Sequence, residues 1–97
     1  MAVYVTLYRY TDEGMKGIRS AAELAAGWQA EAQQRGVTVQ ALYWLLGQYD
    51  AMTIVEGDDD AVQGLLLAIG AQGALRTETH RAMTMEDIQR LAAGIGG

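Results

Sequence analysis

Residues 37–56, "VTVQALYWLLGQYDAMTIVE", contain two runs of β-branched, aromatic and other apolar residues, and only Gly47-Gln48 separates them. Runs of this composition are typical of β-strands, and a glycine followed by one further residue is typical of a two-residue type II′ hairpin turn. The stretch therefore predicts two antiparallel neighbouring strands, at residues 37–46 and 49–56. Gly47 supplies the positive φ that such a turn requires.

The position of this turn predicts which side chains share a face of the sheet. It places Trp44 opposite Ala51 and Tyr43 opposite Met52, and successive side chains along each strand point to opposite faces. Tyr49 and Asp50 are therefore expected on opposite faces. One face holds Leu42, Trp44, Leu46, Tyr49, Thr53 and Val55, and the other holds Val39, Ala41, Tyr43, Leu45, Asp50, Met52 and Ile54.

Helices and further strands are predicted on both sides of the hairpin. Residues 3–10 and 74–83 have the composition of strands. Helices are expected after Ser20, after the acidic run at residues 58–60 and after Thr84, because each of these begins with residues that favour a helix N-terminus.

The order of these elements is β-α-β-β-α-β followed by a C-terminal helix, which is the ferredoxin-like motif. The predicted fold class is α+β, with a four-stranded antiparallel sheet, two helices on one face of the sheet and the extra helix at the C-terminal end. We expect a single domain over residues 1–97, compact over residues 1–92 and with a frayed tail at residues 93–97.

The composition predicts a second buried surface. Hydrophobic residues make up 51% of the chain, and neither face of the inner strands has a polar pattern. In a ferredoxin-like domain the second face of the sheet is bare, and a bare apolar sheet is unusual on a monomer. We therefore expect a homodimer or a higher homo-oligomer that pairs through this sheet face.

The net charge and the lack of cysteine argue against several classes of partner and cofactor. A net charge of −5 repels phosphate backbones and anionic membrane surfaces, so neither nucleic acid nor a membrane is expected as a partner. Without cysteine and with a single histidine, no metal site and no cofactor are expected, and helix capping explains the acidic run at residues 58–60. The opening residues lack the features of a signal peptide, which favours a cytoplasmic protein.

Several of these stretches together resemble the GYD domain family, named for a Gly-x-Tyr-Asp element that Gly47, Tyr49 and Asp50 match. "TIVEGDDD", "LRTETHRAM" and the opening strand followed by "TDEGMKGI" are also similar to that family, so the resemblance extends to about residue 92. It implies a ferredoxin-like fold of the dimeric α+β barrel type, in which two sheets pack face to face, and it implies no particular reaction. His80 departs from the family pattern, which usually has leucine at this position.

Two side chains are candidates for proton transfer. Asp50 is expected beside Tyr43, where burial would raise the pKa of its carboxyl group, and His80 is expected beside Glu78 by strand alternation. The structural alternative makes the Gly-x-Tyr-Asp element a turn, a packing residue and a carboxylate that binds local backbone amides or a tyrosine. The structural alternative for His80 is a pairing with Glu78 or with solvent.

The tyrosines of the first strand form the other candidate surface. Tyr4, Tyr8 and Tyr10 alternate on one face of this strand, and we expect that face to lie in the subunit interface. If it also met Tyr43, the shared surface would suit a ligand. Tyr8, Tyr43 and Glu78 are therefore the candidate ligand-binding residues.

The preferred interpretation is a small homo-oligomeric protein without an assigned reaction. The alternative is a cofactor-independent enzyme or small-molecule binder, with a cavity formed by the sheet face and the partner subunit. In that alternative Asp50 and His80 handle protons, while Tyr8 and Tyr43 position a small apolar or aromatic ligand. Haem bound through His80 is a third interpretation, which rests on analogy of fold alone.

Overall fold

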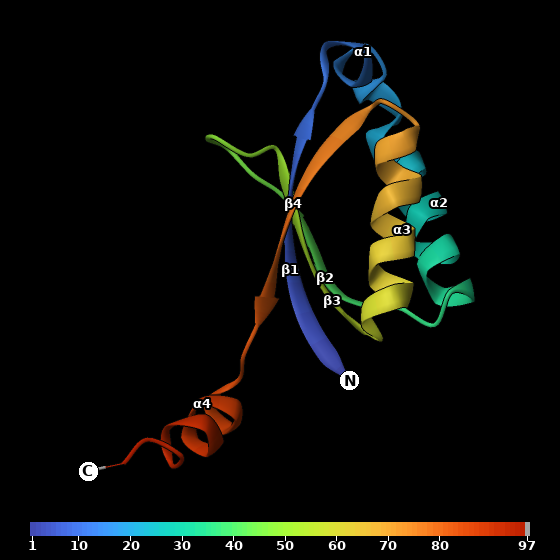
Figure 1. Cartoon of the computed structure of the whole chain (residues 1–97). Coiled ribbons are helices and arrows are strands. Elements are labelled where there is room, and N and C mark those ends of the chain that lie inside the picture. Colours follow the sequence, from blue (N-terminus) through green and yellow to red (C-terminus); the bar gives the residue numbers. More distant parts are fainter. Residues whose placement is uncertain (97) are drawn as a thin grey trace.

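The computed structural model describes residues 1–96 and contains one antiparallel sheet with helices α2 and α3 packed on one of its faces (Figure 1). Its four strands lie in the order β2-β3-β1-β4. The predicted α+β class and the ferredoxin-like order of the elements are confirmed. The elements are β1 (Ala2–Tyr10), α1 (Asp12–Met15), the 3-10 helix η1 (Ile18–Ser20), α2 (Ala21–Gln34), β2 (Thr38–Trp44), β3 (Ala51–Gly57), α3 (Asp59–Ala71), β4 (Leu75–Ala82) and α4 (Met85–Ala92).

The core lies between the sheet and the two long helices. Four apolar side chains of α3 recur at helical spacing and are buried, namely Val62, Leu65, Leu66 and Ile69. From the sheet, β1 and β3 contribute aromatic, aliphatic and hydroxyl side chains. The buried hydroxyl groups are paired, since Tyr8 Oη lies 3.0 Å from Thr53 Oγ1, and Thr6 Oγ1 lies 2.9 Å from Thr79 Oγ1. This pairing offsets the cost of burying polar groups.

The alternating tyrosines of β1 belong to this core, so their expected place in a subunit interface is wrong. Tyr4 and Tyr8 are buried within the chain. Tyr8 pairs with Ala51, whereas the next residue back, Leu7, pairs with Met52, so the tyrosines and Met52 lie on opposite faces. Both faces of β1 are apolar, and alternation alone does not indicate which of the two the helices cover.

The predicted register of the β2–β3 hairpin is confirmed near the turn, where Trp44 lies opposite Ala51. Further along, a bulge in β2 between Val39 and Ala41 interrupts the alternation. Val39 therefore lies opposite Val55 on the helix-covered face, and not beside Ala41 as predicted.

The connection between these strands is longer than the predicted two-residue turn, because β2 ends at Trp44 and β3 begins at Ala51. Within it, the Leu45 amide donates to the Asp50 carbonyl oxygen at 2.9 Å. Gly47 has the positive φ expected of it, at 138°. The loop extends from the sheet on the side away from α2 and α3 (Figure 1).

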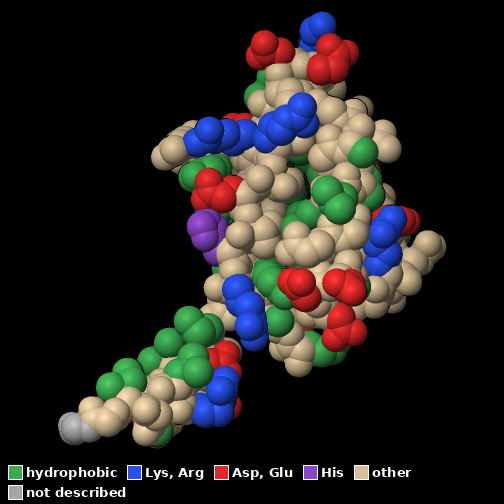
Figure 2. Space-filling model, in the orientation of Figure 1, with side chains coloured by type: hydrophobic (Ala, Val, Ile, Leu, Met, Phe, Trp, Pro, Cys, Tyr) green, Lys and Arg blue, Asp and Glu red, His purple; other side chains and the backbone are tan. Residues whose placement is uncertain are grey.

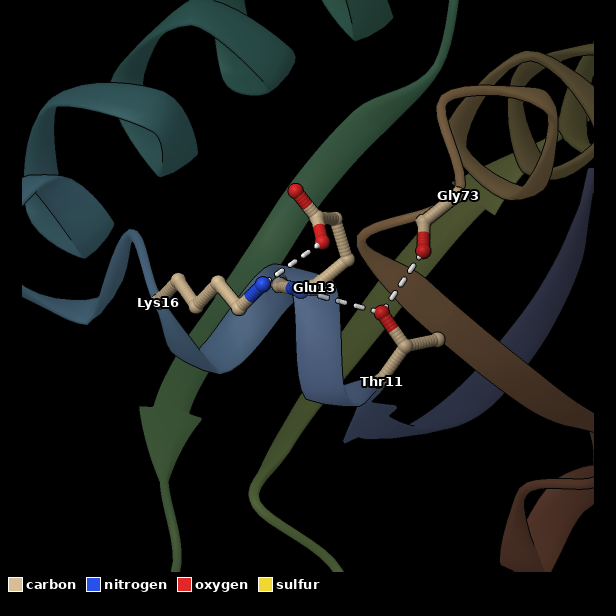
Figure 3. A network of polar contacts seen from close by, with 5 residues as sticks. Thr11, Glu13, Lys16 and Gly73 are labelled. Atoms are coloured by element: carbon tan, nitrogen blue, oxygen red, sulfur yellow. Dashed lines mark hydrogen bonds and ion pairs between the residues drawn. The ribbon is translucent and has the colours of Figure 1, made fainter.

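The segment after β1 is fastened to the segment before β4 (Figure 3). The Thr11 hydroxyl donates to the Gly73 carbonyl oxygen at 2.7 Å and accepts from the Gly14 amide at 3.0 Å, which caps α1. The Thr11 amide also donates to the Ala74 carbonyl oxygen at 3.0 Å. Thr11 thus follows the last residue of β1, caps α1 and links both elements to the loop before β4.

The caps of the other helices differ from one another. Ser20 stands at the N-cap of α2 as expected, but its side chain makes no capping hydrogen bond. At α4, the Thr84 hydroxyl accepts from the Asp87 amide at 3.1 Å and the Asp87 carboxylate accepts from the Thr84 amide at 3.0 Å. Helix α4 projects from the end of β4, and the predicted tail after it includes Gly97, which lies outside the described residues.

Candidate functional site

The face of the sheet opposite α2 and α3 is covered by neither of these helices (Figure 1). Directly opposed residues of antiparallel strands point to the same face, so the ladder identifies the side chains on this surface. We call it the open face, and it consists of Val3, Val5, Leu7, Arg9, Ala41, Tyr43, Met52, Ile54, Glu56, Arg76, Glu78, His80 and Ala82.

The open face is apolar in its centre and polar along β4. Val5 lies between Ile54 of β3 and His80 of β4. The aliphatic members are half-buried, and Tyr43 at the β2 side is 62% exposed. The open face thus combines an apolar centre with a polar border along β4.

Four side chains form a connected group at the β4 side of the open face, which we call the polar edge. Glu78 Oε2 lies 2.6 Å from His80 Nε2, and the Tyr49 hydroxyl donates to Glu78 Oε1 at 3.0 Å. The guanidinium carbon of Arg9 lies 4.7 Å from the centre of the Tyr49 ring, in cation–π geometry. The group thus joins β1, the hairpin loop and β4.

The contacts of the polar edge favour a charged Glu78. The hydrogen bond with His80, and then that from Tyr49, hold the pKa of the Glu78 carboxyl below its ordinary value. The same bond to Glu78 raises the pKa of Tyr49, so its hydroxyl stays protonated. A carboxylate with a lowered pKa is a weaker base, and the arrangement therefore suits fixed hydrogen bonding better than proton abstraction.

The two candidate proton-transfer residues are not brought together. His80 lies on the open face, and the alternation that predicted its pairing with Glu78 is confirmed. Asp50 instead binds the backbone of β1, because its carboxylate accepts from the Tyr10 amide at 2.9 Å and its amide donates to the Tyr8 carbonyl oxygen at 2.8 Å. A backbone amide is the kind of partner that the structural alternative expected, but this amide belongs to a strand 40 residues away and is not local to Asp50.

The predicted face of Tyr49 is wrong. Its hydroxyl reaches Glu78 on the open face, whereas alternation from the hairpin placed Tyr49 with Trp44 on the helix-covered face. Alternation fails here because Tyr49 lies in the loop and not in a strand. The candidate ligand-binding residues also separate, because Tyr8 is buried under the helices while Tyr43 belongs to the open face.

Arg9 and the side-chain role of Tyr49 were not among the candidates. A signal for Arg9 is present in the sequence, because the period of two that begins with Val3 and continues to Leu7 reaches Arg9 on the same face. The contact of Tyr49 spans 29 residues and depends on the loop conformation, for which no local sequence pattern is available.

A separate cavity of about 770 Å³ lies between α2 and the sheet. Its lining includes Leu24 and Trp28 of α2, Trp44 of β2, and Tyr8. Alanines of α2, including Ala25 and Ala32, also line it. Neither of the proton-transfer candidates, nor Glu78 or Tyr43, is among the lining residues.

The fold and the open face define a small ferredoxin-like α+β domain with one sheet face free for contact. The chain belongs to the GYD domain family, whose model matches residues 4–92. It is similar to the glutamine synthetase and cystathionine beta-lyase binding protein of Thermus thermophilus, with 30% identity over 90 residues that cover 91% of this chain and 95% of that protein. Over residues 1–96, no helix has the length and apolar character needed to cross a membrane.

Proposed function

We propose that this protein is a homo-oligomeric binding protein: two copies pair through the open face, and the assembled unit binds another protein. The observation that carries the proposal is the apolar open face, which occupies the centre of the sheet and has no covering helix. A cytoplasmic location, expected from the sequence, is part of the proposal.

The polar edge supports pairing of a defined geometry. Apolar surface supplies the driving force for association, whereas charged and hydrogen-bonding groups at its border restrict the orientation of the partner. Arg9, Glu78 and His80 form such a border on one side of the apolar centre.

Light scattering after gel filtration tests the pairing. The wild-type chain is expected at twice its 10.5 kDa mass or a multiple of it. Val5→Lys introduces a charge at the centre of the open face and is expected to give a folded monomer, because Val5 is only half-buried in a single copy and a lysine can extend its ammonium group into solvent. Ala30→Lys adds the same charge on the exposed outer side of α2 and is expected to leave the mass unchanged. A wild-type monomer at micromolar concentration contradicts the proposal.

Binding to an enzyme is the second half of the proposal, and it is supported by the relative named for binding glutamine synthetase and cystathionine beta-lyase. The test is to immobilise this chain and to add each of the two enzymes, glutamine synthetase and cystathionine beta-lyase, from the organism that produces this chain. Saturable binding of at least one is expected. If neither enzyme binds at micromolar concentration, the proposed enzyme binding is contradicted, whereas the proposed self-association is not affected.

A second candidate function, binding of a small apolar or aromatic molecule, is favoured by the cavity under α2. Two indole rings, of Trp28 and Trp44, line it and suit a planar ligand. This cavity lies on the helix side of the sheet, unlike the cavity expected between the open face and a partner. The measurement is quenching of tryptophan fluorescence by naphthalene derivatives. Ala25→Leu fills part of the cavity and is expected to weaken binding, and equal binding by both chains contradicts this function.

A further inference from the structure

Helix α4 carries an apolar side that is largely exposed to solvent. Met85, Ile88 and Leu91 recur at helical spacing and are 91%, 50% and 49% exposed. Figure 2 shows hydrophobic side chains gathered on this helix, which stands away from the body of the molecule. The hydrogen bonds and ion pair of its Thr84, Asp87 and Arg90 side chains all stay within the helix and its cap.

A helix of this length needs a packing partner. It has 8 residues, whereas isolated helices shorter than about 12–15 residues are marginally stable in water. Its capping box contributes only on the order of 1 kcal/mol. The apolar side is therefore expected to be buried against another surface when the protein functions.

The course of the chain indicates which surface this is. Only Met83 and Thr84 separate β4 from α4, and the helix leaves the sheet on the side away from α2 and α3 (Figure 1). That is the side of the open face. A second copy bound to the open face would lie close to α4 of the first copy. The α4 of the second copy would likewise lie close to the first copy.

The area of the open face also calls for an additional contact. Four strands spaced about 4.8 Å apart, over roughly seven residues each, present on the order of 400 Å². A stable protein interface buries about 800 Å² on each partner. A helix of 8 residues, about 12 Å long and 10 Å wide, covers roughly 120 Å². The two helices of a two-fold pair would raise the area on each partner to roughly 640 Å², which reaches the lower end of the standard range of about 600–1,000 Å² per partner.

We propose that α4 is an arm that packs its apolar side against a second copy of this chain and completes the interface begun by the open face. The arm rests on the proposed self-association, and it adds a second contact region to it. The arm is a separate element at the end of β4, so it can be weakened without changing the sheet or the core.

Two double variants of the full chain test the arm. Ile88→Ala with Leu91→Ala shortens the apolar side, and Glu86→Ala with Gln89→Ala shortens the polar side of the same helix. Alanine favours helix at all four positions. The control variant also loses the first-turn acid Glu86, which favours the helix N-terminus, so an unchanged dissociation constant there excludes a general effect of helix stability. Analytical ultracentrifugation is expected to give a dissociation constant at least about tenfold higher for the first variant, and an unchanged constant for the second.

The results separate the arm from the self-association. A wild-type chain that stays monomeric overturns the pairing through the open face, and the arm with it. A wild-type oligomer whose dissociation constant is the same in the apolar variant overturns the arm alone. Loss of enzyme binding by that variant, with self-association intact, would assign α4 to a foreign partner and also overturn the arm. Hydrogen exchange supplies a second measurement, since the α4 amides are expected to lose protection on dilution below the dissociation constant.

Discussion

Among the glycines of residues 1–96, Gly14 is the one at which an added Cβ atom would come closest to other backbone atoms. A Cβ atom added there would overlap the carbonyl group of Ala74, which is backbone and cannot move aside as a flexible side chain could. Gly14→Ala is expected to lower the free energy of unfolding by about 2 kcal/mol or more, measured by urea denaturation. Gly17→Ala is the control, because its added Cβ would lie 3.6 Å from the nearest atom. Equal losses in both variants would contradict the overlap.

Glu78 gives the clearest prediction for pH. Its pKa is lowered in the folded chain, first by His80 and then by Tyr49. His80→Ala is therefore expected to raise the pKa of Glu78 more than Tyr49→Phe does, as measured by NMR titration of the carboxyl carbon. A group with a lowered folded pKa stabilises the fold above its unfolded pKa, and this contribution is lost as pH falls through the folded pKa. The stability difference between wild type and Glu78→Gln should thus disappear in acid, and a difference that persists there has another origin.

Helix α2 contains one glycine inside it and is followed by another with a different role. Gly27 has open space around it, so Gly27→Ala is expected to raise the free energy of unfolding by about 0.5–1 kcal/mol through better helix propensity. Gly36 follows the helix at φ 77°, where alanine costs about 1–2 kcal/mol. The same substitution should therefore have opposite signs at the two positions in thermal and urea denaturation. A lower free energy of unfolding for Gly27→Ala would mean that α2 is under strain at this position.

The type and order of the strands and helices could be predicted from sequence because they depend on local periodicity and caps. The hairpin shows the limit of this reasoning. Its register near Trp44 followed from the turn, but the bulge before Ala41 moved Val39 to the other face, and the late start of β3, at Ala51, left Tyr49 in the loop, where alternation does not apply. A single inserted residue reverses every later assignment, because the period of a strand is two.

For the candidate site as well, the local contacts could be predicted from the sequence and the contacts between distant segments could not. Glu78 and His80 lie two apart on one strand, so their contact is local. The contacts of Tyr49 with Arg9 and Glu78 join three segments and depend on tertiary structure. The choice of the helix-covered face of β1 is also tertiary, because both faces are apolar and the helices decide between them.

The stability of the assembled protein should depend on its concentration. The open face and the apolar side of α4 are both exposed in a single copy, so folding and association are linked if copies pair through them. For a dimer of two such chains, an unfolding enthalpy of about 0.7 kcal/mol per residue corresponds to a Tm increase of about 3–4 °C for each tenfold rise in concentration. Calorimetry of the wild-type chain over a hundredfold range should reveal this slope. Val5→Lys should show a lower Tm without the slope, because a monomer unfolds at a temperature that does not depend on concentration. A wild-type Tm that stays constant over the range would mean that the fold is stable without a partner, and that the exposed apolar surface is left for another protein.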